Sequence, residues 1–417
     1  MKVYKFGGAS VRNAEGVKNL ANIVEGEDSL FIIVSAMGKT TNALERVFGH
    51  MQNGRKEEAN EEIKQIQAYH AEIIDELWGE HTDINEVTLL FGQLRNIVND
   101  IVYRQTDAEL WYDTIVAFGE LISTTIISKY LNHIGTRNRW IDMRTTLLTN
   151  QRHKDANVDI KASKHRLRAA IENTGVGVFV GQGFIGGAPD GTTTTLGREG
   201  SDYSAAVVAN ILMAESMSVW KDVDGVLNAD PKIFKDAVKI DALNYLDTIE
   251  LAYSGAQIIH PKTIKPLQQK NIPLYVRPFG NKHASGSAIT GDVERAYEPI
   301  MIHKENQVLL KLHSRDLSFV LEEKFARLFT TFDSHRIRIN LVHNSAVDLY
   351  IAVDASWHID EAISELMADG FDVEKQEDVV LVTIRYYNDE LYRQYAFDPR
   401  IVIKQTTPHS LRFIRTN

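Results

Sequence analysis

Short apolar runs alternate with longer amphipathic stretches in the first part of the chain. KVYKF at 2–6 is followed by helical periodicity near 14–23, and LFIIVS at 30–35 is followed by helical periodicity through 42–53 and 60–77. Strand-like runs that alternate with amphipathic helices are typical of βαβ units, whose strands form a parallel sheet. The pattern therefore predicts an α/β fold for this region.

The alternation continues to about Asp292. Between 83 and 133 the periodicity predicts a helical hairpin with one buried face, formed by Trp111, Ile115, Phe118, Ile122 and Ile126. Further strands are predicted at NRWID, VGVFVGQGFIG, MSVWKD and IPLYVR, with helices at 203–213, 248–254 and 263–270. We therefore expect one α/β domain with a mostly parallel sheet over residues 1–292.

The pattern changes after Asp292. Strands at QVLLKLHS, RINLVH, VDLYIAVD and FDVEKQ, with helices at 317–335 and 359–369, give the order β-α-β-β-α-β over about 306–376. That order is typical of a ferredoxin-like unit. Three more strands, VVLVTIRYY, PRIVIKQ and HSLRFIR, follow at about 377–417 with at most a short helix among them. We expect a second, α+β region over 300–417, with its first unit complete and its second abbreviated.

The net charge and the lack of cysteine exclude some classes of partner and of chemistry for this protein. The 417 residues carry a formal net charge of −10, which argues against nucleic acid or an anionic membrane as partner, because both require a positive surface field. The chain has no cysteine, so it has no disulfide and no thiolate nucleophile. No signal peptide and no run of about eighteen apolar residues is present. We expect a cytoplasmic protein.

The Gly-Lys-Thr in the stretch VSAMGKTTNAL looks like the end of a phosphate-binding P-loop, but the spacing of the glycines excludes that motif. A P-loop requires a second glycine five positions before its Gly-Lys, and the residue five positions before Gly38 is Ile33. Ile33 lies within the predicted strand and cannot supply the turn. We therefore expect Lys39 to be a solvated loop lysine.

Three other loops carry candidate chemistry, although each alone also fits an ordinary turn. In KFGGAS, Lys5 precedes two glycines that let backbone N–H groups approach an anion. A glycine- and threonine-rich loop ends in Ser201 and Asp202, which are predicted N-caps of the next helix and so mark an anion site. Arg198 could neutralise charge there. VWKDVDGVLNADPK contains two acidic turns.

Taken together, six ordered motifs resemble the amino acid kinase superfamily, and they are most similar to aspartate kinases. The motifs are KFGGAS, SAMGKTTN, FGE at 118–120, TTLGREGSDYSA, DVDGVLNADPK and ELAYSGAQIIHPKTI. The resemblance covers the whole chain. It implies a three-layer αβα kinase domain followed by ACT-type regulatory units, through which aspartate kinases form homodimers and sense amino acids.

The implied reaction transfers the γ-phosphoryl group of ATP, with Mg²⁺, to the β-carboxylate of L-aspartate, the first step towards lysine, threonine and methionine. An aspartate side chain with a pKa of roughly 4 is already ionised at neutral pH, so no catalytic base is required. The difficulty is repulsion between the carboxylate and the phosphates, which cations relieve. Lys5 is the predicted cation.

The resemblance also implies a role for individual residues. Lys5 and Asp202 would be catalytic, and Lys5, Gly7, Gly8, Asp222 and Lys232 would hold the nucleotide. Thr41, Glu120, Arg198 and Ser201 would hold aspartate, with Arg198 on the α-carboxylate and Glu120 on the α-amino group. No residue is assigned to a metal.

Four residues depart from the family pattern. Ala9 and Lys221 replace threonine, Glu199 replaces glycine, and Gln257 stands where many relatives carry lysine. We expect Glu199 to point to solvent, because a carboxylate facing the phosphates would add to their repulsion. The altered loop HNSAVD and the abbreviated second unit leave feedback control by lysine or threonine open.

Two alternatives remain. Another member of the superfamily, such as a glutamate, acetylglutamate or uridylate kinase, would share the phosphate loops. A catalytically weak amino-acid-sensing partner would fit the departures at Glu199 and Gln257. Turnover that depends on the acceptor separates these hypotheses.

Overall fold

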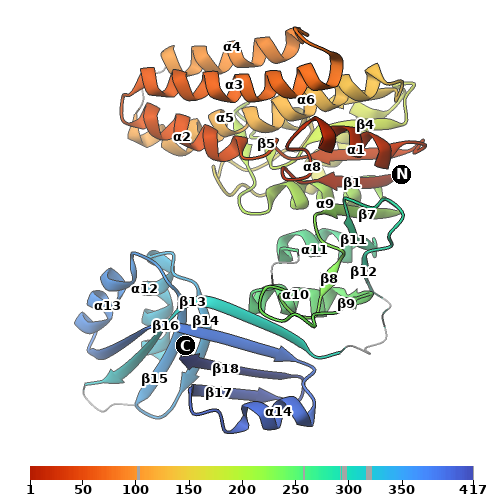
Figure 1. The fold of residues 1–417 in the computed structure, drawn as a ribbon. Helices are drawn as coiled ribbons and strands as arrows, with labels where there is room; N and C mark the ends of the chain where they lie inside the picture. The colour runs from red at the N-terminus through yellow and green to blue at the C-terminus, as the bar shows by residue number, and fades with distance from the viewer. Residues whose placement is uncertain (101–103, 257–258, 292, 294–297, 316–321, 417) are drawn as a thin grey trace. The chain divides into compact units, whose positions relative to one another are not determined.

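The computed structural model describes residues 1–100, 104–256, 259–291, 293, 298–315 and 322–416 (Figure 1). The chain divides into two compact units. The first comprises Met1–Val226, Lys239–Ile249 and Ile258–Glu294, and the second comprises Leu227–Val238, Glu250–Gln257 and Arg295–Asn417.

An eight-stranded sheet forms the centre of the first unit. Its strand order is β10-β12-β11-β7-β1-β2-β4-β3, and all neighbouring strands are parallel except β11 and β12. The strands are β1 Lys2–Phe6, β2 Leu30–Val34, β3 Asn138–Ile141, β4 Val178–Gln182, β7 Ser216–Lys221, β10 Ala242–Asn244, β11 Leu274–Pro278 and β12 Ser287–Thr290. Short strand pairs are β5 Ile185–Gly187 with β6 Thr193–Thr195, and β8 Val226–Leu227 with β9 Lys239–Ile240. The predicted mostly parallel sheet is confirmed.

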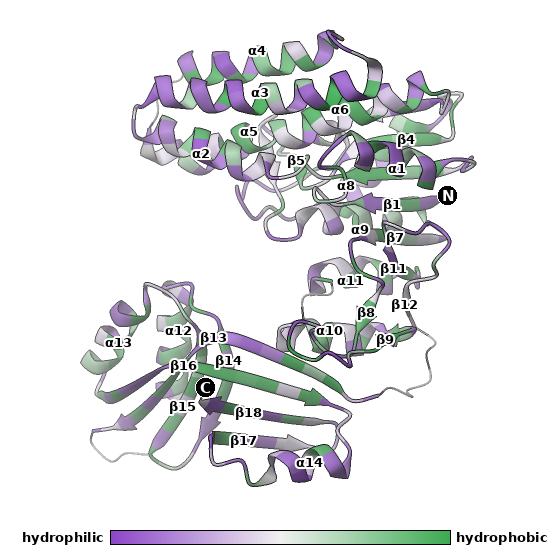
Figure 2. Cartoon of the chain, in the orientation of Figure 1, coloured by the Kyte–Doolittle hydropathy of each residue, from purple (hydrophilic) through white to green (hydrophobic). Residues whose placement is uncertain are grey.

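Helices cover both faces of this sheet, as expected for a three-layer αβα fold (Figure 1). One face carries α1 Ala14–Val24, α2 Thr40–Gln52, α3 Lys56–Trp78, α4 Asn85–Asp100, α5 Ala108–Val116 and α6 Phe118–His133. The other carries α8 Ile160–Ile171, α9 Gly200–Leu212 and α11 Pro261–Gln268. The remaining helices are the turn η1 Gln105–Asp107, α7 Met143–Thr146 and α10 Tyr245–Ser254. In Figure 2, α3 and α4 alternate between purple and green, because each has one apolar side on the core and one polar side in water.

The alternation of side chains along β1 places Lys5 on the α9 face of the sheet. Tyr4 and Phe6 point into the large core on the opposite face, where they pack against Trp220 of β7. Successive side chains of a strand point to opposite faces, so Lys5 points towards α9. The two-residue period of β1 thus explains why Lys5, near the carboxyl end of the strand, lies on the α9 face of the sheet.

Helix α6 is more buried than its apolar stripe predicts. Of the five predicted stripe residues, four are buried and Trp111 packs against the same core. However, every residue from Phe118 to Ser128 is buried, including residues off the stripe, such as Glu120. The stretch Ala108–His133 is apolar enough to cross a membrane by composition, but 78% of its most apolar window is buried inside the structure, as in the core helix of a soluble protein.

The second unit contains a six-stranded sheet of order β14-β15-β13-β16-β18-β17. Its elements are β13 Ile300–Ser314, α12 Glu322–Ser334, β14 Ile339–Asn344, β15 Asp348–Asp354, α13 Ile359–Ala368, β16 Phe371–Arg385, α14 Asp389–Ala396, β17 Ile401–Thr407 and β18 Ser410–Thr416. The first four strands have the predicted ferredoxin-like order. Helices α12 and α13 pack on one apolar cluster of this sheet, and α14 packs on another. Residues 317–321 of the predicted helix 317–335 lie outside the described residues.

One prediction in this region is wrong. FDVEKQ and VVLVTIRYY were expected to be two strands, but they form the single strand β16, which pairs with β13 over nearly its whole length. Asn306 and Asp378 adopt positive φ angles of 53° and 54° where the register of β13 and β16 shifts. A β-bulge at this point lets β16 continue through its polar central residues as one strand, with no turn between the two predicted halves.

Candidate active site

The first candidate cavity lies at the carboxyl edge of the sheet, where parallel α/β folds commonly bind ligands. It has a volume of about 290 Å³. Its lining residues are Lys5, Ser35, Thr41, Glu120, Phe184, Gly197, Glu199, Gly200, Ser201 and Asp202. Five residues that the sequence nominated from four separate segments therefore meet here: Lys5, Thr41, Glu120, Ser201 and Asp202.

Lys5 and Asp202 form a buried ion pair in this cavity. Lys5 Nζ lies 2.6 Å from Asp202 Oδ1, and the Asp202 side chain is fully buried. Lys221 Nζ lies 3.9 Å from the other carboxylate oxygen. Burial favours the neutral form of Asp202, but the charges of Lys5 and Lys221 outweigh it and lower the pKa of this carboxyl group. Asp202 is therefore an anion that holds cations at the sheet edge.

Helix α9 begins earlier than predicted. Glu199, not Ser201 or Asp202, occupies the N-cap position, with a left-handed φ of 56° and no side-chain cap hydrogen bond. Ser201 and Asp202 thus lie inside the first turn and their side chains face the cavity. The N-cap role predicted for them is wrong, whereas a helix N-terminus at this place, with its affinity for anions, is present.

Glu199 does not point away from the site as expected. Although the residue as a whole is exposed, it lines the cavity and its carboxyl group lies beside that of Asp202. Burial, followed by the charge of Asp202, raises the pKa of Glu199. The repulsion that led us to expect a solvent-facing Glu199 is reduced because two lysines, Lys5 and Lys221, lie nearby.

Glu120 is a buried acid with one acceptor to spare. Its Oε1 accepts a hydrogen bond from Ala36 N at 3.0 Å, whereas Oε2 has no hydrogen-bond partner among the described residues. Burial raises the pKa of Glu120 to about 8. An orphaned buried carboxylate oxygen beside a cavity is suited to a ligand that brings its own N–H donors.

Three hydroxyl side chains, those of Ser35, Thr41 and Ser201, also line the Lys5 cavity. Ser35 Oγ donates to Ser201 Oγ at 2.9 Å, which joins the end of β2 to the start of α9. Thr41 contributes to the lining from the first turn of α2. Lys39, two residues earlier, is exposed as predicted.

A buried aspartate anchors the loop that leads to Glu199. Both Asp113 carboxylate oxygens accept hydrogen bonds, from Thr195 Oγ1 at 2.6 Å, from Thr195 N at 3.0 Å and from Lys154 N at 3.0 Å. His153 Nδ1 lies 2.8 Å from the same carboxylate. These bonds fix strand β6, and with it the position of the following residues 197–199 at the cavity.

The glycines of KFGGAS allow two loops to touch. Gly38 N donates to Gly8 O at 2.9 Å, and a Cβ atom on Gly8 would lie only 2.5 Å from Ala36 O. A Cβ on Gly7 would lie 3.6 Å from Lys5 Nζ. A side chain at position 8 would therefore separate the loop after β1 from the loop after β2.

We expect Gly8→Ala to destabilise the protein by about 1–3 kcal/mol, the typical cost of overpacking. Thermal unfolding measures the effect. Gly49→Ala is the matched control, because nothing lies within 4 Å of its Cβ in α2 and alanine favours a helix interior. Equal stability of Gly8→Ala and Gly49→Ala would contradict the assigned close approach.

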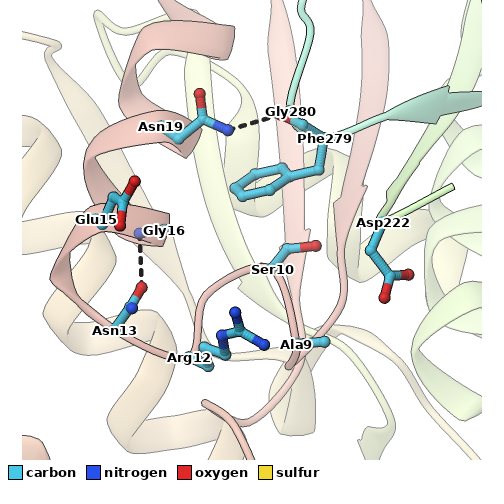
Figure 3. A pocket seen from close by; sticks show the side chains of 10 residues that line it. All are labelled: Ala9, Ser10, Arg12, Asn13, Glu15, Gly16, Asn19, Asp222, Phe279 and Gly280. Carbon is cyan, nitrogen blue, oxygen red and sulfur yellow. Dashed lines mark hydrogen bonds between the residues drawn. The ribbon is translucent and has the colours of Figure 1, made fainter. Parts of the chain in front are cut away.

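A second cavity of about 400 Å³ lies beside α1. It is lined by Ala9, Ser10, Arg12, Asn13, Glu15, Gly16, Asn19, Asp222, Phe279 and Gly280. Figure 3 shows that these side chains come from α1 and from the loops after β1, β7 and β11, and that Asn19 Nδ2 donates to Phe279 O at 2.6 Å. Asp222 thus lies in this cavity rather than among the residues that line the Lys5 cavity.

Two other residues with a predicted role, Arg198 and Lys232, are not among the residues that line the Lys5 cavity. Arg198 is exposed and is not among its lining residues, although Gly197 and Glu199 on either side are. Lys232 is exposed and belongs to the second unit, where its backbone N–H donates to Asp230 Oδ1 in a turn. Gln257 lies outside the described residues.

Sequence reasoning missed three residues that shape the site. Ser35 could have been found, because it is the last residue of the predicted strand 30–35, at the carboxyl edge. Phe184 has a left-handed φ of 67°, and Lys221 approaches Asp202 only through the pairing of β7 with β1. Phe184 carries no local signal in the sequence, and Lys221 stands out only as a departure from the family pattern.

Known proteins share both the sequence and the architecture of this chain. The profile of the "Amino acid kinase family" matches residues 1–278. The lysine-sensitive aspartokinase 3 of Escherichia coli is 30% identical over 359 residues, which cover 85% of this chain and 78% of that protein. The chloroplastic aspartokinase 1 of Arabidopsis thaliana is 33% identical over 370 residues, which cover 85% of this chain and 63% of that protein.

Solved structures extend the similarity to the whole fold. Escherichia coli aspartokinase III in complex with aspartate and ADP has a TM-score of 0.83 at 26% identity, covering 100% of this chain and 96% of that one. The same enzyme in complex with lysine and aspartate has a TM-score of 0.81. The chain spans about two thirds of the length of the chloroplastic relatives and more of the bacterial one. From its motifs, its αβα sheet and these matches, the chain belongs to the amino acid kinase family and, within it, to the aspartokinases.

Proposed function

We propose that this protein is an aspartate kinase, which transfers the γ-phosphoryl group of ATP to the β-carboxylate of L-aspartate. The observation that carries the proposal is the pairing, in one cavity, of an anchored lysine with a buried glutamate that has an unused acceptor. The lysine suits phosphoryl oxygens, and the glutamate suits an ammonium group. An amino acid with a second carboxylate fits between them.

In the proposed reaction, a β-carboxylate oxygen of aspartate attacks the γ-phosphorus. The bond from that phosphorus to the β-γ bridging oxygen breaks, and its electron pair leaves with ADP. No proton moves, so the site requires positioning and charge neutralisation rather than a base. Lys5, held by Asp202, would neutralise the transferred oxygens, and Gly7 and Gly8 would let backbone N–H groups reach the phosphates.

The same proposal assigns the amino acid end of the substrate. The α-amino group would donate to Glu120 Oε2, and Thr41 and Ser201 would contact the carboxylates. Arg198 is proposed to bind the α-carboxylate from the adjoining loop, and Asp222 and Lys232 are proposed to serve the nucleotide.

Mg²⁺ would accompany the nucleotide and neutralise charge on its phosphates. The described residues contain no group of three or more metal-ligating side chains. That fits Mg²⁺, which usually keeps several waters and is bound through substrate phosphates with one or two carboxylates. We assign no resident metal site.

The proposal includes an arrangement of regions. Residues 1–292 would form the catalytic domain and residues 300–417 an ACT-type regulatory region through which two chains form a cytoplasmic homodimer. The family match over 1–278 and the ferredoxin-like strand order support this division. Light scattering after size-exclusion chromatography tests the dimer, which requires twice the mass of the chain.

An acyl-phosphate trap tests the activity. The protein is incubated with Mg-ATP and hydroxylamine, and L-aspartate, L-glutamate and N-acetylglutamate are offered separately. Hydroxamate with aspartate alone is expected. Hydroxamate with another acceptor would point to a different kinase of the superfamily, and none from folded protein would favour an amino-acid-sensing partner.

The pKa of Glu120 predicts a pH profile for aspartate use. Because only the ionised carboxylate attracts the ammonium group, kcat/KM for aspartate should fall about tenfold per pH unit below about pH 8. The bound ammonium group favours the ionised form, so the fall in kcat should lie at lower pH. Initial rates from about pH 6 to 9 measure both profiles.

Glu120→Gln is the diagnostic variant for this profile. It should lower kcat/KM by about 10²-fold, as expected for loss of one partner of a buried charge pair, and flatten the pH profile. Glu45→Gln, on α2 and outside the cavity lining, is the control. An unchanged profile in Glu120→Gln would separate Glu120 from the ammonium group.

A further inference from the structure

Asp202 lies between two lysines that come from neighbouring strands. Its Oδ1 is 2.6 Å from Lys5 Nζ and its Oδ2 is 3.9 Å from Lys221 Nζ. The Asp202 side chain is fully buried, whereas the Lys5 and Lys221 side chains retain 11% and 25% exposure. Both ammonium groups thus lie near one buried anion, and Lys5 also lines the cavity.

Strand pairing explains why the two lysines share a face of the sheet. Strands β1 and β7 are parallel neighbours in which Lys5 is paired with Val219. Trp220 packs into the core on the opposite face with Phe6. The two-residue period of a strand then places Lys221 on the same face as Val219 and Lys5.

The charges in this cluster do not cancel. Two ammonium groups and one carboxylate leave the trio with a single positive charge. Glu199 is the other acid at this point, and burial, followed by the charge of Asp202, raises its pKa. The two lysines outnumber the one fully buried carboxylate that they share.

We propose that Lys221 is a second catalytic cation, which with Lys5 forms a two-ammonium clamp on the migrating phosphoryl group, Asp202 being their shared counter-ion. This inference rests on the proposed kinase activity and adds a residue to it. In the transition state, charge spreads over the equatorial oxygens of the phosphoryl group. Two ammonium groups on one rigid sheet edge can bind different oxygens at the same time, while Asp202 keeps them from separating.

The clamp predicts a specific kinetic pattern. Lys221→Met should lower kcat by about 10²-fold, the typical effect of removing one donor that stabilises transition-state charge. The KM for aspartate should change little, because the amino acid end is bound elsewhere. Lys221→Arg should restore about a tenth or more of the wild-type kcat, because it keeps the charge but alters the geometry.

Lys239→Met is the matched control. Lys239 also lies in the first unit and has a side-chain exposure of 31%, but it pairs at 2.7 Å with Asp241, which is exposed, and not with the buried Asp202. Its kcat should stay within about threefold of the wild type, as for most surface substitutions. Thermal unfolding of each variant identifies any loss that is due to misfolding.

A binding measurement makes the test independent of turnover. Calorimetric titrations with Mg-ADP and with the Mg complex of the non-hydrolysable analogue AMP-PNP give the preference of each variant for a γ-phosphoryl group. Wild type should prefer AMP-PNP, and Lys221→Met should lose most of that preference. A folded Lys221→Met that keeps both the preference and the wild-type kcat would overturn the clamp.

The two proposals can fail separately. Wild-type protein that makes no hydroxamate yet loses its AMP-PNP preference on Lys221→Met would refute the kinase activity and retain Lys221 as a ligand of the γ-phosphoryl group. Wild-type protein that makes hydroxamate while Lys221→Met and Lys239→Met behave alike in rate and binding would retain the kinase and refute the clamp.

Discussion

Replacing Lys5 by methionine is expected to lower kcat by about 10³-fold, the upper end of the range for loss of one charge-stabilising donor. Lys5 Nζ is the cation closest to Asp202, at 2.6 Å, and its side chain is only 11% exposed. Methionine keeps the bulk of the side chain and removes its charge. The hydroxamate assay under saturating aspartate and ATP measures the loss.

Lys39→Met is the control for Lys5→Met. Lys39 lies in the P-loop-like stretch VSAMGKTTNAL, yet it is exposed and lines neither cavity. Its turnover should remain within about threefold of wild type, as for an ordinary surface position. Equal losses from Lys5→Met and Lys39→Met would contradict the division between a phosphate lysine and a solvated one.

Replacing Asp202 by asparagine should lower kcat by about 10²-fold or more, because the buried counter-ion of Lys5 and Lys221 is lost while the shape of the side chain is kept. Without the anion, the two ammonium groups repel each other and leave their positions at the sheet edge. The rate should fall more than the affinity for aspartate, since Asp202 acts through the lysines. Steady-state kinetics resolves kcat from KM.

A double variant at Asp202 and Glu199 tests whether Glu199 can act as the counter-ion of the two lysines when Asp202 is absent. The charge of Asp202 contributes to the raised pKa of Glu199, so Asp202→Asn should lower that pKa and make Glu199 a better counter-ion for the two lysines. The double variant Asp202→Asn/Glu199→Gln should therefore lose more activity than the sum of the single losses in free energy predicts. Asp190→Asn, on an exposed loop, controls for the change of an aspartate. If the loss of activation free energy in the double variant equals the sum of the two single losses, Glu199 does not replace Asp202 as counter-ion.

Much of the fold was predictable because its elements are long and periodic. The βαβ alternation predicted the parallel sheet, and the order of strands after residue 300 predicted the ferredoxin-like unit. Residues at strand ends were predictable for the same reason, since all parallel strands end at one edge. Lys5 was predictable in this way, whereas the roles of Thr41, Glu120, Ser201 and Asp202 were implied by the resemblance to aspartate kinases. All five line one cavity.

The remaining details depend on contacts between distant segments. The start of α9 at Gly200 depends on Glu199 in a left-handed conformation, which glutamate seldom adopts and which no periodicity encodes. The polar centre of β16 looks like a turn until its pairing with β13 is known. The approach of Lys221 to Asp202 likewise depends on the register of β7 against β1.

In the proposed site, Glu120 holds the amino end of the substrate aspartate, so that the side-chain carboxylate of the substrate meets Lys5. Borohydride reduction of the acyl phosphate, followed by chromatography of the amino acid formed, identifies the carboxylate that accepted the phosphoryl group. Phosphorylation of the β-carboxylate gives homoserine, which is the predicted product. Formation of 3-amino-4-hydroxybutanoate instead would show that the α-carboxylate reacts and would contradict this orientation of the substrate.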